Sequence, residues 1–332
     1  MLNWTIAEQT LPLKFNWKIS RNTSVEKKNF FIDVSDGQNT GKGEVAPNIR
    51  YGETEEIIRE QFKLFLELAP IIPTELTDLE NLLDSLNLCH SLRFGIESAY
   101  VHFLCKNQGV NPAEFFNLQL PANVPTSFSV PILEISEIKD FIQPLQRFAS
   151  LKIKVNQETA LDMVNEVVRH TDQKLRIDGN EAWSDVDALI NFIGKVRNYN
   201  IEFIEQPMPS KLTAEYIYLK QNCQFDLIAD ESIEDKADFA ELKKQFHGVN
   251  MKLMKAGGYQ NGLHILQETR KFGLKTMIGC MVETSLGIYS AMNLADKVDY
   301  LDLDGFLIIK DDPFGLVDER NGLLSFVENT QK

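Results

Sequence analysis

The run Leu151-Lys152-Ile153-Lys154-Val155 is the first of five apolar, strand-length runs with a charged residue at or next to the end. The other four are Leu175-Arg176-Ile177-Asp178, Ile201-Glu202-Phe203-Ile204-Glu205, Asp226-Leu227-Ile228-Ala229-Asp230 and Val249-Asn250-Met251-Lys252. The intervals from Lys154 through Lys252 are 24, 27, 25 and 22 residues, each with room for one strand and one helix. Because a charge buried at a strand end is costly, five in register indicate a shared chemical purpose.

Strand-like runs recur at this interval beyond the five. They lie near 126–130, 151–155, 175–178, 201–205, 227–230, 249–252, 276–279 and 301–304. Segments with helical periodicity lie between most of them, as expected for a (β/α) barrel. A doubly wound open sheet is the alternative, but no phosphate-binding glycine fingerprint follows any strand. Because a turn at 311–315 follows the last strand, we expect a modified TIM barrel of the (β/α)7β type.

The first 118 residues lack this rhythm. We expect strands over 11–20, 29–34 and 41–45, followed by helices over 54–69 and 92–106, with Thr54 as the cap of the first helix. This pattern predicts a separate α+β domain over residues 1–118. The tail, 311–332, is predicted to fold back onto this domain, and the barrel is predicted to span 119–310.

Composition limits the possible partners. The net charge of −14 argues against nucleic acid or an anionic membrane, since both require a basic surface. No stretch approaches 18 apolar residues, and the N-terminus lacks the features of a signal peptide. The four cysteines form no CxxC pair and are expected to be reduced. We therefore expect a cytoplasmic protein with a small-molecule partner, and a homo-oligomer is compatible with the sequence.

Three of the charged strand ends are carboxylates. Active sites of barrels lie at the C-terminal ends of the strands, where Asp178, Glu205 and Asp230 are expected. Oxygen ligands without histidine or cysteine favour a hard cation, Mg²⁺ first and Mn²⁺ second. Alternatively, each carboxylate could cap a helix or pair with a surface lysine, but three evenly spaced carboxylates are poorly explained in this way.

Two lysines flank the carboxylates in sequence. Lys154 and Lys252 belong to the second and sixth strands, which lie opposite one another in a ring of eight. One amine could remove a proton from carbon while the other delivers one to the opposite face. Such a base needs a pKa lowered from its ordinary value, and Lys152 could supply a neighbouring cation or stabilise an oxyanion. A single strand-end lysine often only extends its ammonium into water.

These residues together resemble the motifs of the enolase superfamily, specifically its muconate-lactonising-enzyme-like subgroup. The motifs here are Lys152-Ile153-Lys154, Asp178-Gly179-Asn180, Glu205-Gln206-Pro207, Asp230-Glu231 and Asn250-Met251-Lys252. The resemblance implies an N-terminal capping domain, completed by the C-terminal tail, over the barrel. It also implies Mg²⁺ on Asp178, Glu205 and Asp230, with Lys154 and Lys252 as the acid/base pair. The shared chemistry, of which this superfamily is a standard example, removes a proton α to a metal-bound carboxylate through an enediolate.

Two further stretches resemble the dipeptide epimerases of that subgroup. They are Gly279-Cys280-Met281-Val282-Glu283-Thr284-Ser285-Leu286-Gly287 and Asp302-Leu303-Asp304-Gly305. In that group an Asp-x-Asp pair holds the substrate's α-ammonium, which implies this role for Asp302 and Asp304. The alternative places Asp302 at the surface and makes Asp304 the cap of a turn. The resemblance also suggests substrate contacts from Met281, Thr284 and Ser285, and supporting contacts to the metal ligands or cavity wall from Asn180, Glu231 and Glu283.

Substrate preference in this superfamily comes largely from two loops of the capping domain. Here they are expected near 18–24 and 47–52, with Arg21, Asn22 and Tyr51 as candidate substrate contacts. A cation there could receive an acidic side chain, as in the Ala-Glu epimerases. However, Asn22 occupies a position where an arginine is expected, so the preferred side chain stays open.

The function predicted from the sequence is therefore Mg²⁺-dependent epimerisation of a dipeptide at the α-carbon of its C-terminal residue. The alternatives are o-succinylbenzoate synthase or N-acylamino acid racemase activity on the same scaffold. A metal-stabilised binding protein without activity is a third possibility, which the presence of both lysines disfavours.

Overall fold

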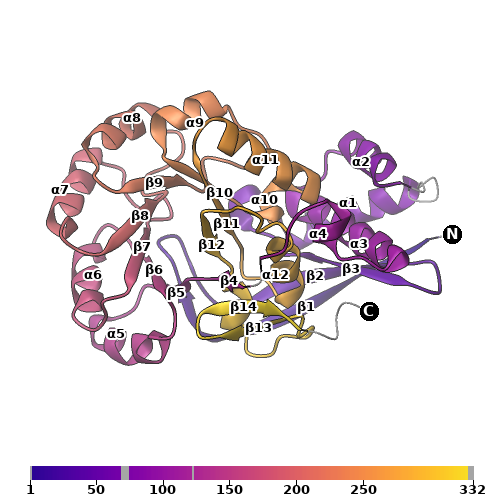
Figure 1. Cartoon of the computed structure of the whole chain (residues 1–332), viewed down its shortest axis with the longest axis horizontal. Coiled ribbons are helices and arrows are strands. Elements are labelled where there is room, and N and C mark those ends of the chain that lie inside the picture. The colour runs from indigo at the N-terminus through magenta and orange to yellow at the C-terminus, as the bar shows by residue number, and fades with distance from the viewer. Residues whose placement is uncertain (1, 69–74, 122, 328–332) are drawn as a thin grey trace.

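The computed structural model describes residues 2–68, 75–121 and 123–327 of the chain. The largest sheet has eight parallel strands in the order β12-β11-β10-β9-β8-β7-β6-β5 and curves into a nearly closed barrel (Figure 1). Its strands are β5 (Phe128–Val130), β6 (Ser150–Lys154), β7 (Lys174–Asp178), β8 (Ile201–Glu205), β9 (Asp226–Ala229), β10 (Gly248–Met251), β11 (Lys275–Gly279) and β12 (Tyr300–Asp302). All eight fall within two residues of the positions predicted from the sequence, and the modified TIM barrel is confirmed.

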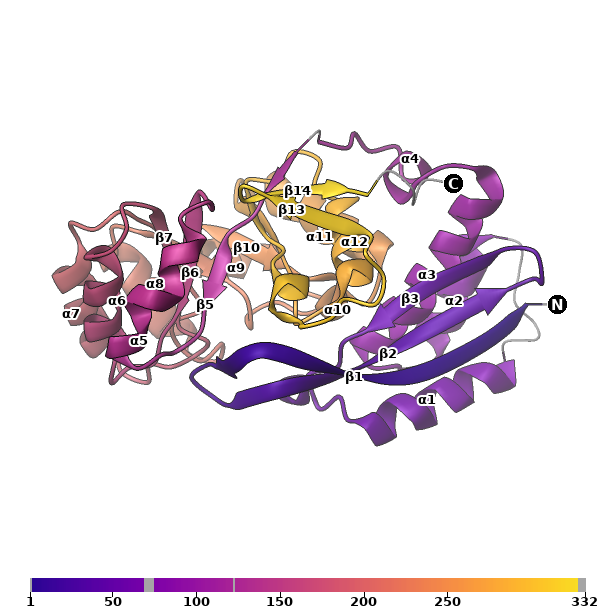
Figure 2. The ribbon, with the colours of Figure 1, turned by 90° about the horizontal axis from the view of Figure 1, so that it is seen from below.

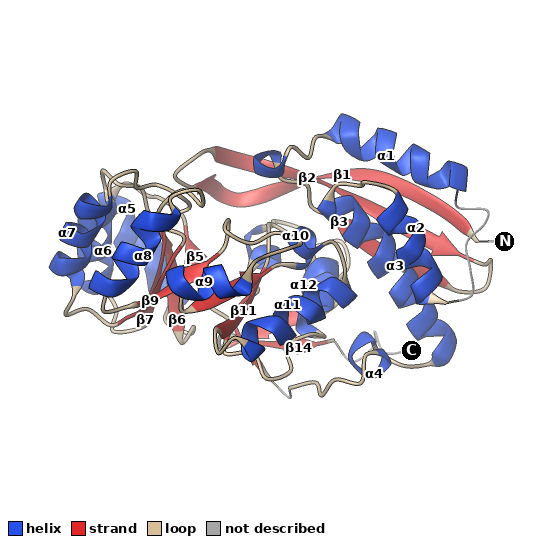
Figure 3. Cartoon of the chain, turned by 90° about the horizontal axis from the view of Figure 1, so that it is seen from above, coloured by secondary structure: helices blue, strands red, loops and turns tan. Residues whose placement is uncertain are grey.

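Helices cover the outside of this sheet (Figure 3). They are α5 (Ile135–Ile142), α6 (Ala160–Val168), α7 (Val186–Val196), α8 (Thr213–Asn222), α9 (Phe239–Gln245), α10 (Leu253–Ala256), α11 (Tyr259–Lys271) and α12 (Ser285–Met292). Alternate residues of each strand face the barrel interior. Phe203, Ile228 and Met277 form a buried apolar cluster there, two residues before the polar strand ends begin. This apolar cluster lies beneath the charged strand ends at the mouth of the barrel.

The N-terminal domain is an antiparallel sheet with helices packed on it. The strands are β1 (Asn3–Lys18), β2 (Thr23–Ser35) and β3 (Thr40–Val45), and the helices are α1 (Glu55–Leu68), α2 (Leu76–Ser85), α3 (His90–Gln108) and α4 (Pro112–Phe115). The hydroxyl oxygen of Thr54 accepts a hydrogen bond from the backbone N–H of Ile57, so the predicted cap of α1 is confirmed. The end of the predicted first helix, Ala69, lies outside the described residues.

Two features of this domain escaped the sequence analysis. Strand β1 begins at Asn3 rather than at residue 11, because residues 3–10 are mostly polar and show one largely exposed face. Helix α2 was not predicted at all. The β1–β2 hairpin extends beyond its sheet and reaches alongside the barrel (Figure 2), where Leu13 pairs with Ile309 and the N–H of Ile132 donates to Lys18.

The tail contacts both parts of the chain. The Phe314 ring meets the Phe31 ring of β2 edge-on at 5.0 Å, as expected for a tail that returns to the first domain. Strands β13 (Val317–Arg320) and β14 (Leu323–Phe326), however, form a small sheet with β4 (Val124–Pro125), just before the barrel. The sequence predicted two domains: a capping domain of residues 1–118 with the tail 311–332, and a barrel domain of residues 119–310. Because the tail contacts both, this division stays a proposal.

Glycines allow β3 to lie directly on α3. A Cβ added at Gly43 would lie 2.0 Å from the backbone oxygen of Gly95, and one added at Gly41 would lie 2.1 Å from that of Ala99. Neither obstacle is a flexible side chain. Both glycines are therefore positions of close backbone packing.

We expect Gly43→Ala to lower the free energy of unfolding by about 1–3 kcal/mol, because the new methyl group must push β3 away from α3. Urea unfolding measures the change. The matched control is Gly194→Ala on α7, where an added Cβ meets nothing within 4 Å and helix propensity favours alanine. Equal stabilities of the two variants would contradict the packing argument.

Candidate active site at the mouth of the barrel

A cavity of about 250 Å³ lies between the strand ends and the first domain. Its barrel wall includes Lys152, Lys154, Asp230, Lys252, Cys280, Met281, Val282 and Asp302. Its other wall includes residues of both predicted loops: Ile19, Arg21, Asn22, Ser24, Pro47, Asn48, Ile49, Arg50 and Tyr51. The two capping loops therefore lie over the mouth of the barrel, at the end where barrel enzymes carry their active sites.

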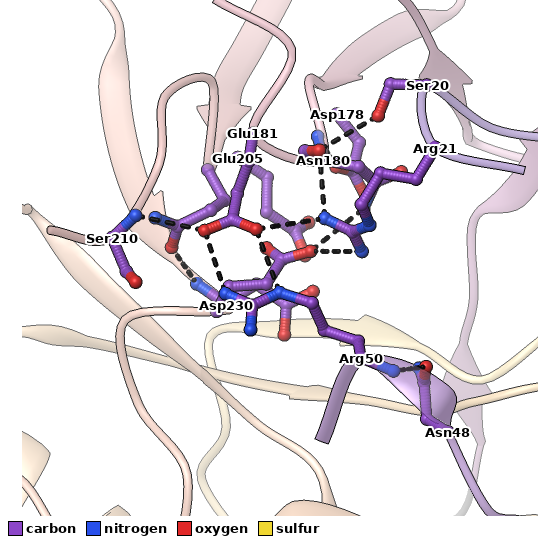
Figure 4. A network of polar contacts seen from close by, with 12 residues as sticks. Ser20, Arg21, Asn48, Arg50, Asp178, Asn180, Glu181, Glu205, Ser210 and Asp230 are labelled. Carbon is purple, nitrogen blue, oxygen red and sulfur yellow. Dashed lines mark hydrogen bonds and ion pairs between the residues drawn. The ribbon is translucent and has the colours of Figure 1, made fainter. Parts of the chain in front are cut away.

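The three predicted carboxylates stand on neighbouring strands. Asp178 and Glu205 end β7 and β8 and are direct partners in the parallel register, and Asp230 directly follows β9. All three side chains are buried at the same end of the barrel (Figure 4). Alternation along each strand turns them inward, on the same side as the apolar layer beneath.

Lysine ammonium groups pair with these carboxylates. Lys152 Nζ lies 2.8 Å from Glu205 Oε2 and 3.1 Å from Asp178 Oδ2. Lys154 Nζ lies 2.6 Å from the same Asp178 oxygen, and Lys252 Nζ lies 2.8 Å from Asp230 Oδ2. Lys154 ends β6 and Lys252 follows β10, with three strands between them in the sheet order. The two amines therefore reach the carboxylate group from opposite sides of the mouth.

These ion pairs shift the pKa values of the carboxylates and lysines toward their charged forms, as Asp178 and Lys252 show. Burial acts to raise the pKa of Asp178, but the Lys154 and Lys152 ammonium groups outweigh it and hold that pKa at about 2. Burial acts to lower the pKa of Lys252, but the Asp230 carboxylate outweighs it and raises that pKa above its ordinary value. The lowered pKa expected of a base is therefore wrong for Lys252 in this structure, because its carboxylate partner stabilises the charged form.

Sequence reasoning missed two members of this cluster. Lys255 is buried, with its Nζ 2.6 Å from Asp230 Oδ1 and 2.5 Å from the backbone oxygen of that residue. It does not line the cavity, whereas Lys252 does. Asn250 donates from Nδ2 to Glu205 Oε1 at 2.8 Å. Its position two residues before Lys252, on the same strand face, is the signal that could have identified it.

The carboxylates are of the chemical type that binds a hard cation, but in this structure they are not arranged as a metal site. The oxygens of Asp178, Glu205 and Asp230 are the kind of ligand that Mg²⁺ prefers. Glu205 Oε2 is buried and accepts no hydrogen bond, although the Lys152 ammonium lies close to it. In the described part of the chain, however, no three His, Cys, Asp or Glu side chains converge closely enough to hold a metal. The cause is the lysines, which occupy the oxygens.

The structure separates Asp302 from Asp304. Asp302 lines the cavity, where Lys152 Nζ lies 2.7 Å from its Oδ2 and the Ser127 hydroxyl donates to its Oδ1 at 2.6 Å. Asp304 does not line the cavity and accepts from the backbone N–H of Ser129. Burial, reinforced by the nearby Asp302 charge, raises the pKa of Asp304 to about 7. The expected pair of carboxylates in the mouth is thus one carboxylate on the cavity wall and a buried neighbour that does not reach it.

The loop after β11 holds the barrel to the first domain. Both the backbone N–H and the hydroxyl of Thr284 donate to Glu44 on β3, and the N–H of Ser285 donates to Asp312 of the tail. Glu283 accepts from the N–H of Met281. Of the residues expected here, Met281 lines the cavity, whereas Thr284, Ser285 and Glu283 do not. Thr284 and Ser285 are already paired with Glu44 and with the tail, and Glu283 is paired within its own loop, so these contacts are structural.

Two arginines tie the capping loops to the barrel (Figure 4). Arg21 pairs with Glu231 at 2.8 Å and with Glu181 at 3.2 Å, and Arg50 pairs with Glu181 at 3.0 Å. Asn180 donates from its backbone N–H to Asp178 Oδ1 and accepts at its backbone oxygen from Arg21. The Arg21 guanidinium, a candidate substrate contact, is therefore already paired, whereas the Asn22 and Tyr51 side chains have no such partner among the described hydrogen bonds and ion pairs.

Comparison with known proteins identifies the family of this chain. The family model described as enolase C-terminal domain-like matches residues 137–303. An L-Ala-D/L-amino acid epimerase from Pedosphaera parvula is 32% identical over 98% of this chain and 96% of its own.

Two solved structures share the fold. A dipeptide epimerase from Enterococcus faecalis V583, complexed with Mg and the dipeptide L-Leu-L-Tyr, has a TM-score of 0.88 and 24% identity, over 98% of this chain and 96% of its own. An N-succinyl Arg/Lys racemase from Bacillus cereus also has a TM-score of 0.88, with 19% identity over 99% of this chain and 96% of its own.

The chain belongs to the enolase superfamily, in the group of its epimerases. The expectation that it is an isomerase is confirmed. No helix in the described ranges is both long and apolar enough to cross a membrane. The cytoplasmic location and a homo-oligomer stay predictions.

We expect Glu181→Gln to loosen the capping loops, because both arginines lose a charged partner. Amide hydrogen exchange at Tyr51 and Gly52 should quicken by roughly threefold to tenfold, as for an ion pair worth about 1 kcal/mol. Glu166→Gln is the matched control, since Glu166 pairs with Arg169 and His170 on α6. Unchanged exchange at both amides in Glu181→Gln would count against the arginine contacts.

Proposed function

We propose that this protein is a Mg²⁺-dependent dipeptide epimerase that inverts the α-carbon of the C-terminal residue. The observation that carries the proposal is the placement of Lys154 and Lys252 on opposite sides of three buried carboxylates. Inversion requires proton removal on one face of a carbon and delivery on the other, and two opposed amines suit this task. The epimerase from Pedosphaera parvula and the magnesium-bound relative from Enterococcus faecalis support it.

The proposed reaction moves one proton off the substrate and one onto it. A neutral lysine on one side takes the α-proton, and the electron pair of the C–H bond passes into the adjacent carboxylate to form an enediolate. The ammonium of the opposite lysine then gives its proton to the other face of that carbon. Lys152 lies deeper, between Asp178, Glu205 and Asp302, where its fixed positive charge would help to orient these groups.

Asp178, Glu205 and Asp230 would hold the metal, for which Mg²⁺ is the first choice and Mn²⁺ the second. When bound, the metal would supply positive charge that stabilises the negative charge developing on the substrate carboxylate. Asn250 and Asn180 already donate to Glu205 and Asp178 and would keep these side chains oriented.

Asp302 is the proposed partner of the substrate's α-ammonium. It is the carboxylate of the expected pair that reaches the cavity wall, and it stands on the opposite side of the mouth from β8. Met281, Asn22 and Tyr51, which also line the cavity, are proposed to contact the rest of the dipeptide. The Arg21 guanidinium is proposed to act by holding its loop closed.

The alternative is racemisation of an N-acylamino acid or an o-succinylbenzoate synthase reaction. This alternative is retained because the chain shares its fold with the N-succinyl Arg/Lys racemase from Bacillus cereus. Such substrates lack a free α-ammonium, so Asp302 would pair with Lys152 and Ser127 alone and would contribute no contact to the substrate. The dipeptide is favoured for this reason.

We expect the wild-type protein with Mg²⁺ to epimerise dipeptides and to exchange the α-proton of their C-terminal residue in D₂O. Lys154→Ala and Lys252→Ala should each lower inversion by about 10²–10⁴-fold, since each removes one proton-transferring group. Each variant should still exchange the epimer whose α-proton faces the remaining lysine, as followed by mass shift. Lys236→Ala, at an exposed surface lysine, is the control. Full inversion by both variants, or no exchange by the wild type with any dipeptide, would refute the proposal.

Asp302→Asn distinguishes the two functions. Its kcat/KM for dipeptides should fall at least about tenfold, because the α-ammonium loses a buried charged partner. Any activity on N-acylamino acids should fall much less. Asp304→Asn, which alters the neighbour outside the cavity wall, is the control. A similar loss on both substrate types would show that Asp302 acts through Lys152 rather than on the ammonium.

A further inference from the structure

One cation on the cavity wall has no charged partner among the residues that the structure describes. The other lining cations are all paired with carboxylates: Lys152, Lys154, Lys252, Arg21 and Arg50. Lys27 also lines the cavity, and its ammonium makes no hydrogen bond or ion pair with any residue that the structure describes. Its side chain is partly buried. A built cavity with one unpaired charge indicates where a ligand of opposite charge would bind.

Strand pairing fixes the part of the cavity that Lys27 faces. Lys27 is the register partner of Leu11, whose buried side chain packs with Val282, Ile308 and Ile309. Asn29, two residues further along the same strand face, donates to the backbone oxygen of Val282 at 3.0 Å. Lys27 therefore faces the segments that follow β11 and β12, rather than the side of the mouth that carries Asp178, Glu205 and Asp230.

The surroundings of Lys27 are apolar. Val282 and Ile308 line the cavity beside it, and burial lowers the pKa of its ammonium without any carboxylate to offset the effect. The apolar surroundings therefore stabilise the charged form of Lys27 poorly. A ligand carboxylate beside the ammonium would supply the missing counter-charge, whereas a neutral or cationic group would not.

The proposed function decides which part of a dipeptide comes to this place. If the reacting α-carbon lies between Lys154 and Lys252, its carboxylate points toward β7, β8 and β9. The N-terminal residue then extends the other way, toward Asp302 at the end of β12. This is the side that Lys27 faces through Val282 and Ile308.

We infer that Lys27 is a specificity-determining residue that receives an anionic side chain on the N-terminal residue of the dipeptide; this rests on the proposed function. The relative from Pedosphaera parvula is named for an N-terminal alanine. An acidic N-terminal residue would therefore set this chain apart. The apolar wall around Lys27 suits the methylene groups of such a side chain, and the ammonium suits its carboxylate.

The test compares dipeptides that differ only in charge. The kcat/KM for epimerisation is measured for Glu-Ala and its neutral counterpart Gln-Ala, with wild type, Lys27→Met and Lys27→Glu. We expect the wild type to prefer Glu-Ala by at least tenfold, and Lys27→Met to lose that preference while acting on Gln-Ala within about twofold of the wild type. Lys27→Glu should prefer Lys-Ala. The matched control, Lys28→Met, alters the neighbouring lysine, which pairs with Glu55, and should keep the wild-type preference.

Several results would overturn the inference. Equal kcat/KM for Glu-Ala and Gln-Ala in the wild type would do so, even if Lys27→Met failed to fold. A preference for Ala-Glu over Ala-Gln without one for Glu-Ala would place the anion on the other residue. An equal loss on both substrates in Lys27→Met would make Lys27 a structural residue. In all three results dipeptides are still turned over, whereas failure of the proposed function means exchange with no dipeptide.

Discussion

The pairing of buried ammonium groups with buried carboxylates is the interaction on which the mouth of this barrel depends. Four lysines, at positions 152, 154, 252 and 255, meet four acids, at positions 178, 205, 230 and 302, in contacts of 2.6–3.1 Å. A single one of these charges would be very costly to bury. Together their opposite charges largely offset one another, so the strand ends can come close. These ion pairs hold the strand ends that line the cavity, and so they help to set its shape.

The same principle joins the two parts of the chain. Glu44 of β3 is buried where the first domain meets the barrel, and it accepts hydrogen bonds from Asn29, Thr284 and Gly287. Arg21 and Arg50 cross the boundary in the other direction and meet Glu231 and Glu181. Apart from the Asn29 contact, which lies within the first domain, these contacts pair a charge of one part of the chain with groups of the other. The capping loops are thus held over the cavity by polar contacts that are specific in direction, unlike apolar packing.

The sequence predicted the barrel well because strand ends carry their own signal. Side chains alternate between the two faces of a strand, so Asp178 and Glu205 are predicted to point into the barrel even when the first residue of the strand is misplaced. The charged cluster therefore follows from the positions of these residues in the sequence. The roles of Thr284, Asp304 and Glu44 could not be predicted in this way. Their partners lie in other parts of the chain, 240 residues away in the case of Glu44 and Thr284, and only the packing of β3 on the barrel brings them together. Strand β1 was shortened in the prediction because its first residues carry too few apolar side chains to mark a strand.

The neutrality of the cluster also bears on how a lysine with a raised pKa could act as a base. A divalent cation added among four ammonium and four carboxylate groups leaves an excess of two positive charges, of which a substrate carboxylate removes one. Excess positive charge favours the neutral form of an amine, so the cluster would release a proton from one lysine most readily when it is fully loaded. Lys255 and Lys152 are enclosed by carboxylate or backbone oxygens. Lys152 borders the cavity too but is held by three carboxylates, whereas Lys154 and Lys252 border it and pair with one carboxylate each. Under the proposed function, the number of groups that hold an amine, more than its pKa in the unliganded protein, therefore separates the lysines that transfer a proton from those that only balance charge.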